Sequence, residues 1–258
     1  MKKLFLFALC LLWSAPAFGR ANLGIWPIEV SLWPDKKISE INLNNKGTEI
    51  VRLQIYAKHW DMDEKGKFIE ADSGEFVFYP RLLTIPGGEK KTLRVGYNGE
   101  FPPLEKSYRL YIHELPELNE GGEQQTSGVK VGFNMLMRLS VPLFVSPSKD
   151  VPFIKPSIDK VTKTANGVQL SFGNSGTHHV EIKDISVELL GKGGAVLTKG
   201  NAKLKFFRVL PQRQLSMEVP LDVAQCRAAS QLNVHFKTGK TEKKMDMTIP
   251  LQADCKKI

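Results

Sequence analysis

The chain has 258 residues, a formal net charge of +9, 42% hydrophobic residues and 24% charged residues. This balance excludes a disordered chain, which would carry fewer apolar residues and a denser charge of one sign. Three cysteines exclude a disulfide-dense miniprotein. The five histidines and the cysteines form no Cys–x–x–Cys or His–x–x–x–His spacing, so no metal site is predicted. The length suits one large or two ordinary domains.

Residues 1–19 predict a secretory signal peptide. Lys2 and Lys3 precede an apolar run over 4–13, and small residues follow at alternate positions up to Gly19. The alternative, a membrane anchor, needs about 20 apolar residues, and this run is too short. We therefore expect export, cleavage after Gly19 or, as the second choice, after Ala17, and no membrane insertion.

Export leaves Cys226 and Cys255 in the mature chain, because Cys10 lies in the signal peptide. An even pair in an oxidising compartment predicts one disulfide. The bridge closes a loop of about 30 residues, for which chain entropy gives roughly 3–4 kcal/mol. A redox-active pair is the alternative, but it lacks the close spacing that lowers a thiol pKa.

Alternation of apolar and polar residues dominates the mature chain and predicts β-strands. In the first half, the predicted strands are Leu23–Leu32, Glu40–Leu43, Ile50–His59, Phe76–Tyr79, Leu82–Ile85, Lys91–Gly96, Tyr108–Glu114 and Val129–Val145. Turn signals rich in Gly and Pro separate them, so the sequence favours a β-sandwich.

Three prolines between Ser146 and Pro156 interrupt strand pairing and predict a connection between domains. Beyond it, the predicted strands are Ile158–Thr164, Gly167–Gly173, Val180–Leu190, Lys203–Val209, Gln214–Pro220, Gln231–Lys237 and Lys244–Leu251. The sequence thus predicts an all-β chain with two sandwich domains, residues 20–147 and 148–258. Each is large enough for its own core.

The most informative segment is Val129–Val145. Its odd positions are apolar: Val129, Val131, Phe133, Met135, Met137, Leu139 and Val141. This run is more than twice the usual strand length of about 5–6 residues. One interpretation is a long core strand. The other is a strand offered to another protein's sheet, with alternate side chains entering pockets of the partner.

Five donated side chains at about 1.5–3 kcal/mol each would contribute roughly 8–15 kcal/mol before ordering costs. That is comparable with the stability of a small domain, so a partner lacking one strand could be held folded. An uncovered edge of this kind also predicts self-association when no partner is bound.

Three motifs in the first half of the chain are Ile25-Trp26-Pro27-Ile28, the run from Ser107 to Pro116, and Val141-Pro142-Leu143-Phe144-Val145. They resemble the periplasmic chaperones of the chaperone–usher pathway, and most of all the archaic, spore-coat-U-associated branch. The resemblance implies two immunoglobulin-like domains arranged at an angle, with an interdomain cleft that binds fimbrial subunits. It also implies donor-strand complementation of subunits lacking a C-terminal strand, and delivery to an outer-membrane usher. The implied donor residues are Val129, Val131, Phe133, Met135 and Met137.

One departure from the family pattern concerns the group that anchors the subunit's C-terminal carboxylate. Pap- and Fim-type chaperones use an Arg and a Lys, and the matching positions here are Val30 and Ser140. The resemblance to archaic relatives makes Arg109 the expected replacement, with Arg138 as the second candidate. A guanidinium can pair with a carboxylate through two hydrogen bonds. The alternative for each arginine is an ordinary solvated or cross-strand ion pair.

Other motifs favour no chemistry. The run from Asp61 to Gly66 resembles a calcium loop, but a cation fills its fifth position and a hairpin turn is the better interpretation. The adjacent His178 and His179 predict loop or surface histidines. No nucleophile elbow or phosphate-binding loop is present, and no basic helix supports nucleic-acid binding.

We therefore expect a non-enzymatic periplasmic chaperone for fimbrial subunits, without a cofactor, a metal or a catalytic residue. The alternative is a secreted two-domain surface subunit or adhesin. A third possibility, a secreted enzyme on a sandwich scaffold, has no candidate constellation in the sequence.

Overall fold

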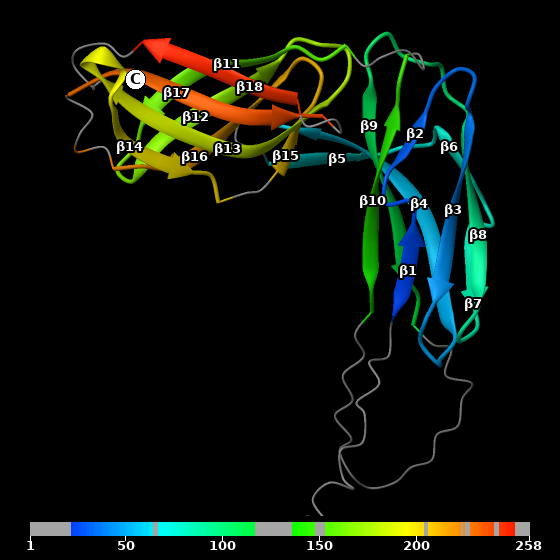
Figure 1. Ribbon diagram of the computed structural model, residues 1–258. Coiled ribbons are helices and arrows are strands. Elements are labelled where there is room, and N and C mark those ends of the chain that lie inside the picture. The colour runs from blue at the N-terminus through cyan, green and yellow to red at the C-terminus, as the bar shows by residue number, and fades with distance from the viewer. Residues whose placement is uncertain are drawn as a thin grey trace, which may run out of the picture.

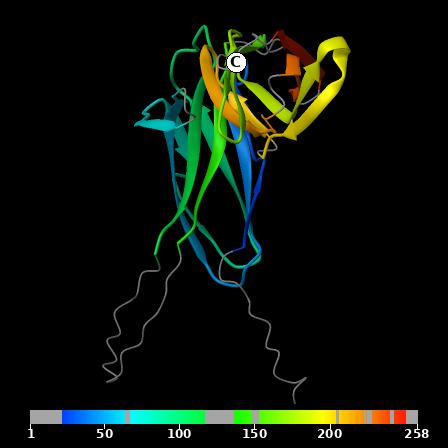
Figure 2. The same cartoon turned by 90° about the vertical axis from the view of Figure 1, so that its left-hand side faces the viewer.

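The computed structural model describes residues 22–63, 67–116, 136–147, 153–203, 206–222, 224, 228–239 and 243–250. These residues form two β-sandwich domains arranged at an angle (Figure 1). In a view turned by 90°, the second domain again lies at one end of the first (Figure 2). No helix in the described ranges is long and apolar enough to cross a membrane.

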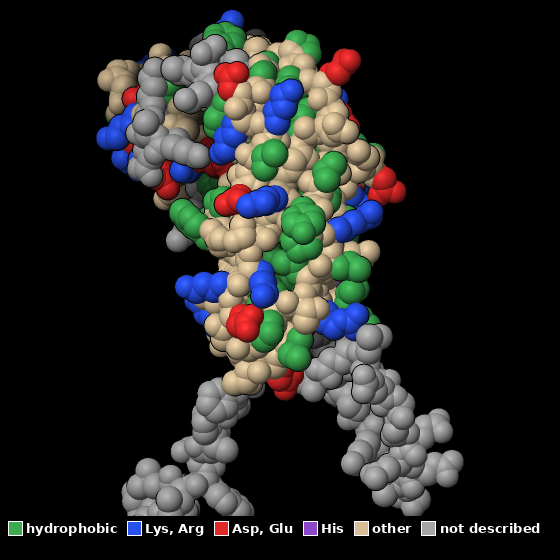
Figure 3. Space-filling view, turned by 90° about the vertical axis from the view of Figure 1, so that its right-hand side faces the viewer, with side chains coloured by type: hydrophobic (Ala, Val, Ile, Leu, Met, Phe, Trp, Pro, Cys, Tyr) green, Lys and Arg blue, Asp and Glu red, His purple; other side chains and the backbone are tan. Residues whose placement is uncertain are grey.

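The first sheet of domain 1 has the strand order β1-β3-β8-β6. Its strands are β1 (Leu23–Trp26), β3 (Ile38–Asn45), β8 (Lys90–Tyr97) and β6 (Phe76–Tyr79). Alternate side chains point into the core, among them the fully buried Leu43 and Leu93. On the other side of this sheet, Ile38, Val77 and Tyr79 are exposed. Figure 3 shows this side of the molecule, with hydrophobic side chains lying among Lys and Arg along domain 1.

The second sheet of domain 1 has the order β2-β10-β9-β4-β5, and β7 also pairs with β4. The strands are β2 (Val30–Leu32), β10 (Arg138–Val145), β9 (Lys106–Glu114), β4 (Val51–Met62), β5 (Phe68–Asp72) and β7 (Leu82–Ile85). Inward-facing residues such as Ile55, Leu110 and Leu143 complete the core of domain 1. We call the opposite side of this sheet, which bears Tyr56, Arg109 and their neighbours, the outer face.

Domain 2 packs a three-stranded sheet, β11-β12-β16, on a sheet ordered β14-β13-β17-β18, with β15 also pairing with β13. The strands are β11 (Pro156–Lys163), β12 (Gly167–Asn174), β16 (Arg213–Pro220), β14 (Val196–Asn201), β13 (Val180–Gly191), β17 (Ala229–Thr238), β18 (Lys243–Pro250) and β15 (Phe206–Val209). A single 3₁₀ turn, η2 (Lys192–Gly194), follows β13. The core of domain 2 is a separate hydrophobic cluster that includes Phe172, Val187 and Val234.

Each domain locks one strand end with a buried asparagine that begins an Asn-x-Gly-Thr sequence. Asn45, at the end of β3, donates through Nδ2 to the carbonyls of Glu49 (2.7 Å) and Ile85 (3.0 Å). Asn174, at the end of β12, donates to the carbonyls of His178 (2.8 Å) and Val209 (3.1 Å). In both turns the asparagine Oδ1 accepts the glycine N–H at 3.0 Å. The same hydrogen-bonded turn therefore recurs in the two sandwiches.

The all-β, two-sandwich prediction is confirmed, and one predicted strand is corrected. The segment Leu23–Leu32 is two strands in different sheets, because β1 pairs with β3 whereas β2 runs parallel to β10. Strands β5 and β14 were absent from the prediction. Strand β5 shows no alternation of apolar and polar residues, since all five of its residues are exposed at the sheet edge and neither side faces a core.

Several predictions lie outside the described residues. They are the signal peptide (1–19), the cysteine pair Cys226 and Cys255, and the first four proposed donor residues, Val129, Val131, Phe133 and Met135. The boundary predicted between 147 and 148 adjoins residues that are likewise outside the description, so these domain limits stay predictions.

Candidate functional site

Strand β10 is paired along one edge and only partly along the other within the described residues. All of Arg138–Val145 pairs antiparallel with β9. On the other side, β2 pairs only with Leu143–Val145. Met137, just before β10, remains bonded to the end of β9. Its carbonyl accepts the Glu114 N–H (2.8 Å), and its N–H donates to a Glu114 carboxylate oxygen (3.0 Å). The edge at 138–141 therefore offers backbone groups to which a further strand can add.

Arg109 lies on the outer face, one strand away from that edge. Its Nη1 donates to Ser140 Oγ on β10 at 3.2 Å. Its guanidinium carbon also lies 4.9 Å from the ring centre of Trp60 and 4.5 Å from that of Phe68. Such contacts are attractive cation–π interactions and hold the group in place. Among the described residues no carboxylate pairs with Arg109, so donors remain for an incoming anion.

Arg138 approaches the same region from β10. Its guanidinium carbon lies 5.5 Å from the ring centre of Tyr111, the residue opposite Ser140 in the β9–β10 ladder. Tyr111 stacks on Tyr56 at 5.1 Å, and its hydroxyl donates to Glu70. Burial and this hydrogen bond raise the pKa of Tyr111 to about 12, although the positive charges of Arg109 and Arg138 act to lower it. Both sequence-predicted cations thus lie beside the Ser140–Tyr111 pair.

Toward domain 2 the outer face becomes buried. Trp60, Met62 and Phe144 pack with Leu210 of domain 2 in one cluster. We call these four residues the junction cluster. The ring of Phe144 stacks on that of His179, with centroids 4.0 Å apart and planes at 17°. Arg208 of domain 2 adds a cation beside the same Phe144 ring, at 5.9 Å.

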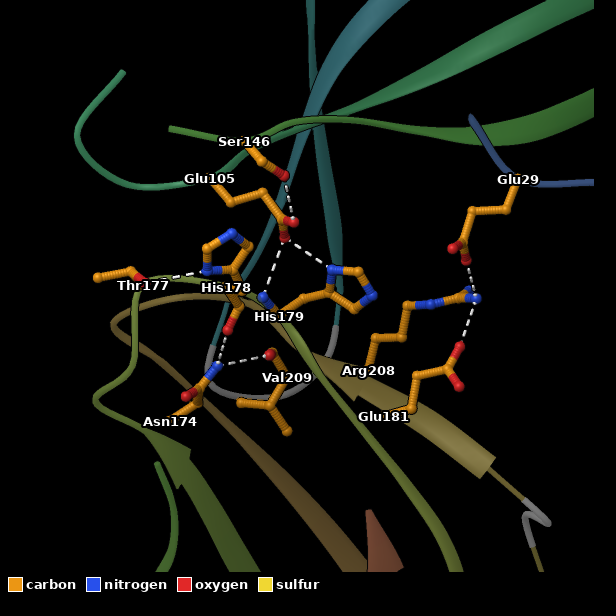
Figure 4. A network of polar contacts seen from close by, with 10 residues as sticks. All are labelled: Glu29, Glu105, Ser146, Asn174, Thr177, His178, His179, Glu181, Arg208 and Val209. Carbon is orange, nitrogen blue, oxygen red and sulfur yellow. Dashed lines mark hydrogen bonds and ion pairs between the residues drawn. The ribbon is translucent and has the colours of Figure 1, made fainter. Parts of the chain in front are cut away.

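Glu105 is buried and forms a polar link between the domains (Figure 4). Its Oε1 accepts the His179 backbone N–H (2.9 Å) and lies 2.7 Å from His179 Nδ1, while Oε2 accepts Ser146 Oγ–H (3.1 Å). The backbone N–H of Glu105 donates to the Thr177 carbonyl at 2.9 Å. Burial alone would raise the pKa of Glu105, but the hydrogen bond and charge of His179 hold it below its ordinary value.

The two adjacent histidines were predicted to be loop or surface residues, and the surface part of that prediction is wrong. His178 is buried, and desolvation lowers its pKa. His179 is partly buried between Phe144 and Glu105. The position of His179 could not be predicted from local patterns, because its partners Phe144 and Glu105 belong to the other domain. His178 is held within its own domain, by Asn174 and Thr177.

The only cluster in the described residues with metal-ligand potential is Glu29, His179 and Glu181. Arg208 Nη2 lies 2.7 Å from an oxygen of Glu29 and 2.7 Å from an oxygen of Glu181 (Figure 4). The guanidinium thus bridges the two carboxylates where a cation would bind. The arrangement is an ion-pair bridge between the domains. The carboxylates of the calcium-like run also have partners within the protein. Asp61 pairs with Arg213, and Asp63 accepts the Lys67 N–H.

Residues 24–150 match the family model "Pili and flagellar-assembly chaperone, PapD N-terminal domain". The chain is 30% identical over 166 residues to the probable fimbrial chaperone EcpE of Escherichia coli K12, covering 64% of this chain and 68% of that protein. The chain belongs to the pilus-assembly chaperone family. This family is not a class of enzymes, in line with the non-enzymatic prediction.

Solved structures agree with this assignment at the level of the fold. The chaperone matches a chain of the CsuC–CsuE chaperone–tip adhesion subunit complex from the archaic Csu pili of Acinetobacter baumannii, with a TM-score of 0.59 and 22% identity. That match covers 89% of this chain and 98% of the matched chain. A complex of the Salmonella enterica SafA pilin with the SafB chaperone gives a TM-score of 0.57 at 14% identity, covering 91% and 99%.

Proposed function

We propose that this chaperone works in the periplasm, after cleavage of its signal peptide, and binds fimbrial subunits that lack their C-terminal strand. It completes each subunit with its own strand and delivers the subunit to an outer-membrane usher. The observation that carries the proposal is the edge of β10 at 138–141, which no strand pairs with among the residues that the structure describes. This edge continues the apolar alternation of the five proposed donor residues from Val129 to Met137.

The position of β2 sets where an added strand would end. Because β2 pairs with β10 from Leu143 onward, a subunit strand along the same edge must stop near Val30. A subunit strand that runs parallel to β10, as β2 does, would then place its terminal carboxylate close to Ser140, which Arg109 already reaches at 3.2 Å. Arg138 approaches the same pair from the adjoining strand. We therefore propose that the two arginines bind the carboxylate together, each charge-assisted hydrogen bond contributing about 1.5–3 kcal/mol.

Co-expression with the cognate subunit tests strand donation. Phe133→Asp and Met135→Asp each place a charge at a proposed donor position, and we expect both to abolish recovery of the subunit complex from the periplasm. Asn134→Asp is the matched control, because it adds a carboxylate at the intervening position, whose side chain points to the opposite side of a strand. Complex yields that stay intact in both donor variants would overturn the proposal. So would finding the protein polymerised on the cell surface.

A further inference from the structure

We infer that the interdomain ion pair Asp61–Arg213 positions Arg109 for carboxylate binding. The inference deepens the proposed function and rests on Arg109 being part of the carboxylate anchor. Asp61 and Arg213 do not touch the proposed carboxylate position themselves. They act through the two aromatic rings that flank the Arg109 guanidinium.

The contacts form a continuous path from domain 2 to Arg109. Arg213 donates from Nε to Asp61 Oδ1 (2.9 Å) and from Nη2 to Asp61 Oδ2 (2.6 Å). Asp61 stands between Trp60 and Met62, both members of the junction cluster. Trp60 in turn packs edge-on against Phe68 at 5.4 Å, and both rings contact Arg109.

The end of the β4–β5 hairpin is held to domain 2 by apolar packing in the junction cluster and by the Asp61–Arg213 ion pair. Within the described part of the chain, strand β5 is the outermost strand of its sheet and pairs only with β4, and it is exposed along its whole length. Phe68, the first residue of β5, is 52% exposed. The two hydrogen bonds from Arg213 to Asp61 add a polar restraint from domain 2 on this end of the hairpin. Arg213 also lowers the pKa of Asp61, as expected for a firmly paired carboxylate.

Two consequences follow from this path. Without Arg213, the hairpin end and its rings gain freedom, and the Arg109 guanidinium loses the fixed orientation that a planar, two-pronged carboxylate contact requires. By thermodynamic linkage, carboxylate binding must also strengthen the contact between the domains by the same factor. The anchor and the domain junction are thus one coupled unit.

The test is an NMR titration of the mature protein with N-acetylglycine, a minimal C-terminal carboxylate, followed at the Arg109 Nε–H signal. N-acetylglycinamide is the uncharged comparison. The wild type is expected to bind the acid and not the amide. In Arg213→Gln, and equally in Asp61→Asn, we expect the affinity for the acid to fall about three- to tenfold, as loss of the aromatic orientation predicts. Arg213→Lys keeps the positive charge but cannot form two parallel hydrogen bonds with Asp61, so its affinity for the acid should lie between those of the wild type and Arg213→Gln.

Arg94→Gln is the matched control, since Arg94 forms a similar ion pair with Glu40 (3.0 Å) on the opposite sheet of domain 1. It should bind the acid like the wild type. A wild type that fails to distinguish acid from amide would refute the anchor itself and the inference with it. A wild type that discriminates while Arg213→Gln and Asp61→Asn bind equally well would refute only the positioning role. If one of these two variants fails to fold, the other still tests the inference, because it removes the same ion pair by a change in the other domain.

Discussion

Phe144→Ala tests whether the junction cluster contributes substantially to the stability of domain 1. Phe144 is fully buried, although it lies on the outer face of its sheet, because Leu210 and His179 of domain 2 cover it. The substitution removes the ring from between the domains and leaves the core of domain 1 intact. It therefore isolates the contribution of the domain contact.

The expected loss follows from the contacts. A buried aromatic side chain removes about 150–250 Å² from water, worth roughly 4–6 kcal/mol at about 25 cal/mol per Å². Stacking on His179 adds about 0.5–1.5 kcal/mol. Alanine keeps part of this area, and the domains can close partly over the gap. We therefore expect the free energy of unfolding to fall by about 3–4 kcal/mol, within the range measured for buried Phe→Ala changes.

Urea denaturation followed by tryptophan fluorescence measures this loss. The three tryptophans beyond the signal peptide, Trp26, Trp33 and Trp60, all lie in domain 1, and Trp60 belongs to the junction cluster. Phe206→Ala is the control, because Phe206 is the same residue type but 52% exposed. Its loss should stay below about 1 kcal/mol. An equally small loss in Phe144→Ala would refute the idea that the junction cluster stabilises the protein.

Three further outcomes are expected. Because the pKa of Glu105 lies below its ordinary 4.5, its stabilisation is present above that pH and lost as the pH falls through the lowered value. Glu105→Gln should therefore flatten the acid limb of melting temperature against pH, and an unchanged limb would contradict this. Asn45→Ala should cost about 2–3 kcal/mol in urea, against less than about 0.5 for the exposed Asn42→Ala, and equal losses would contradict the buried turn lock. Arg109→Ala should weaken capture of the cognate subunit about tenfold or more in a pull-down titration, and a large drop in its melting temperature would instead make the arginine structural.

The alternation of apolar and polar residues predicted the strands well where one side of a sheet is buried and the other is exposed to solvent. In β9, for example, Leu110 and Ile112 face the core while Arg109 and Tyr111 face outward, and this alternation is visible in the sequence. The two strands absent from the prediction lack such contrast. All residues of β5 are exposed, and Val196 in β14 is exposed as well. Periodicity carries information only where burial differs between the two faces.

The interdomain contacts were beyond the reach of such patterns. Asp61 attracted notice as part of a calcium-like run, yet its partner Arg213 lies 152 positions along the chain. Glu105 and His179 are 74 positions apart. These pairs depend on how two finished sandwiches meet, which alternation within either one does not encode. The long apolar alternation from Val129 to Val145, by contrast, is visible in the sequence itself, and it underlies the donor-strand proposal.

The repeated asparagine turn imposes unequal constraints on the two domains. Figure 1 places the end of β3, and so the turn after Asn45, at the end of domain 1 away from domain 2. The turn after Asn174 instead presents the Thr177 carbonyl and His179 to Glu105. A chimera carrying the first turn in the second position should preserve the sandwich but lose the contacts of the His179 side chain with Glu105 and Phe144. We therefore expect the first turn to accept substitutions wherever Asn45 and Gly47 are kept, whereas the second turn must satisfy both its own fold and the contact with Glu105.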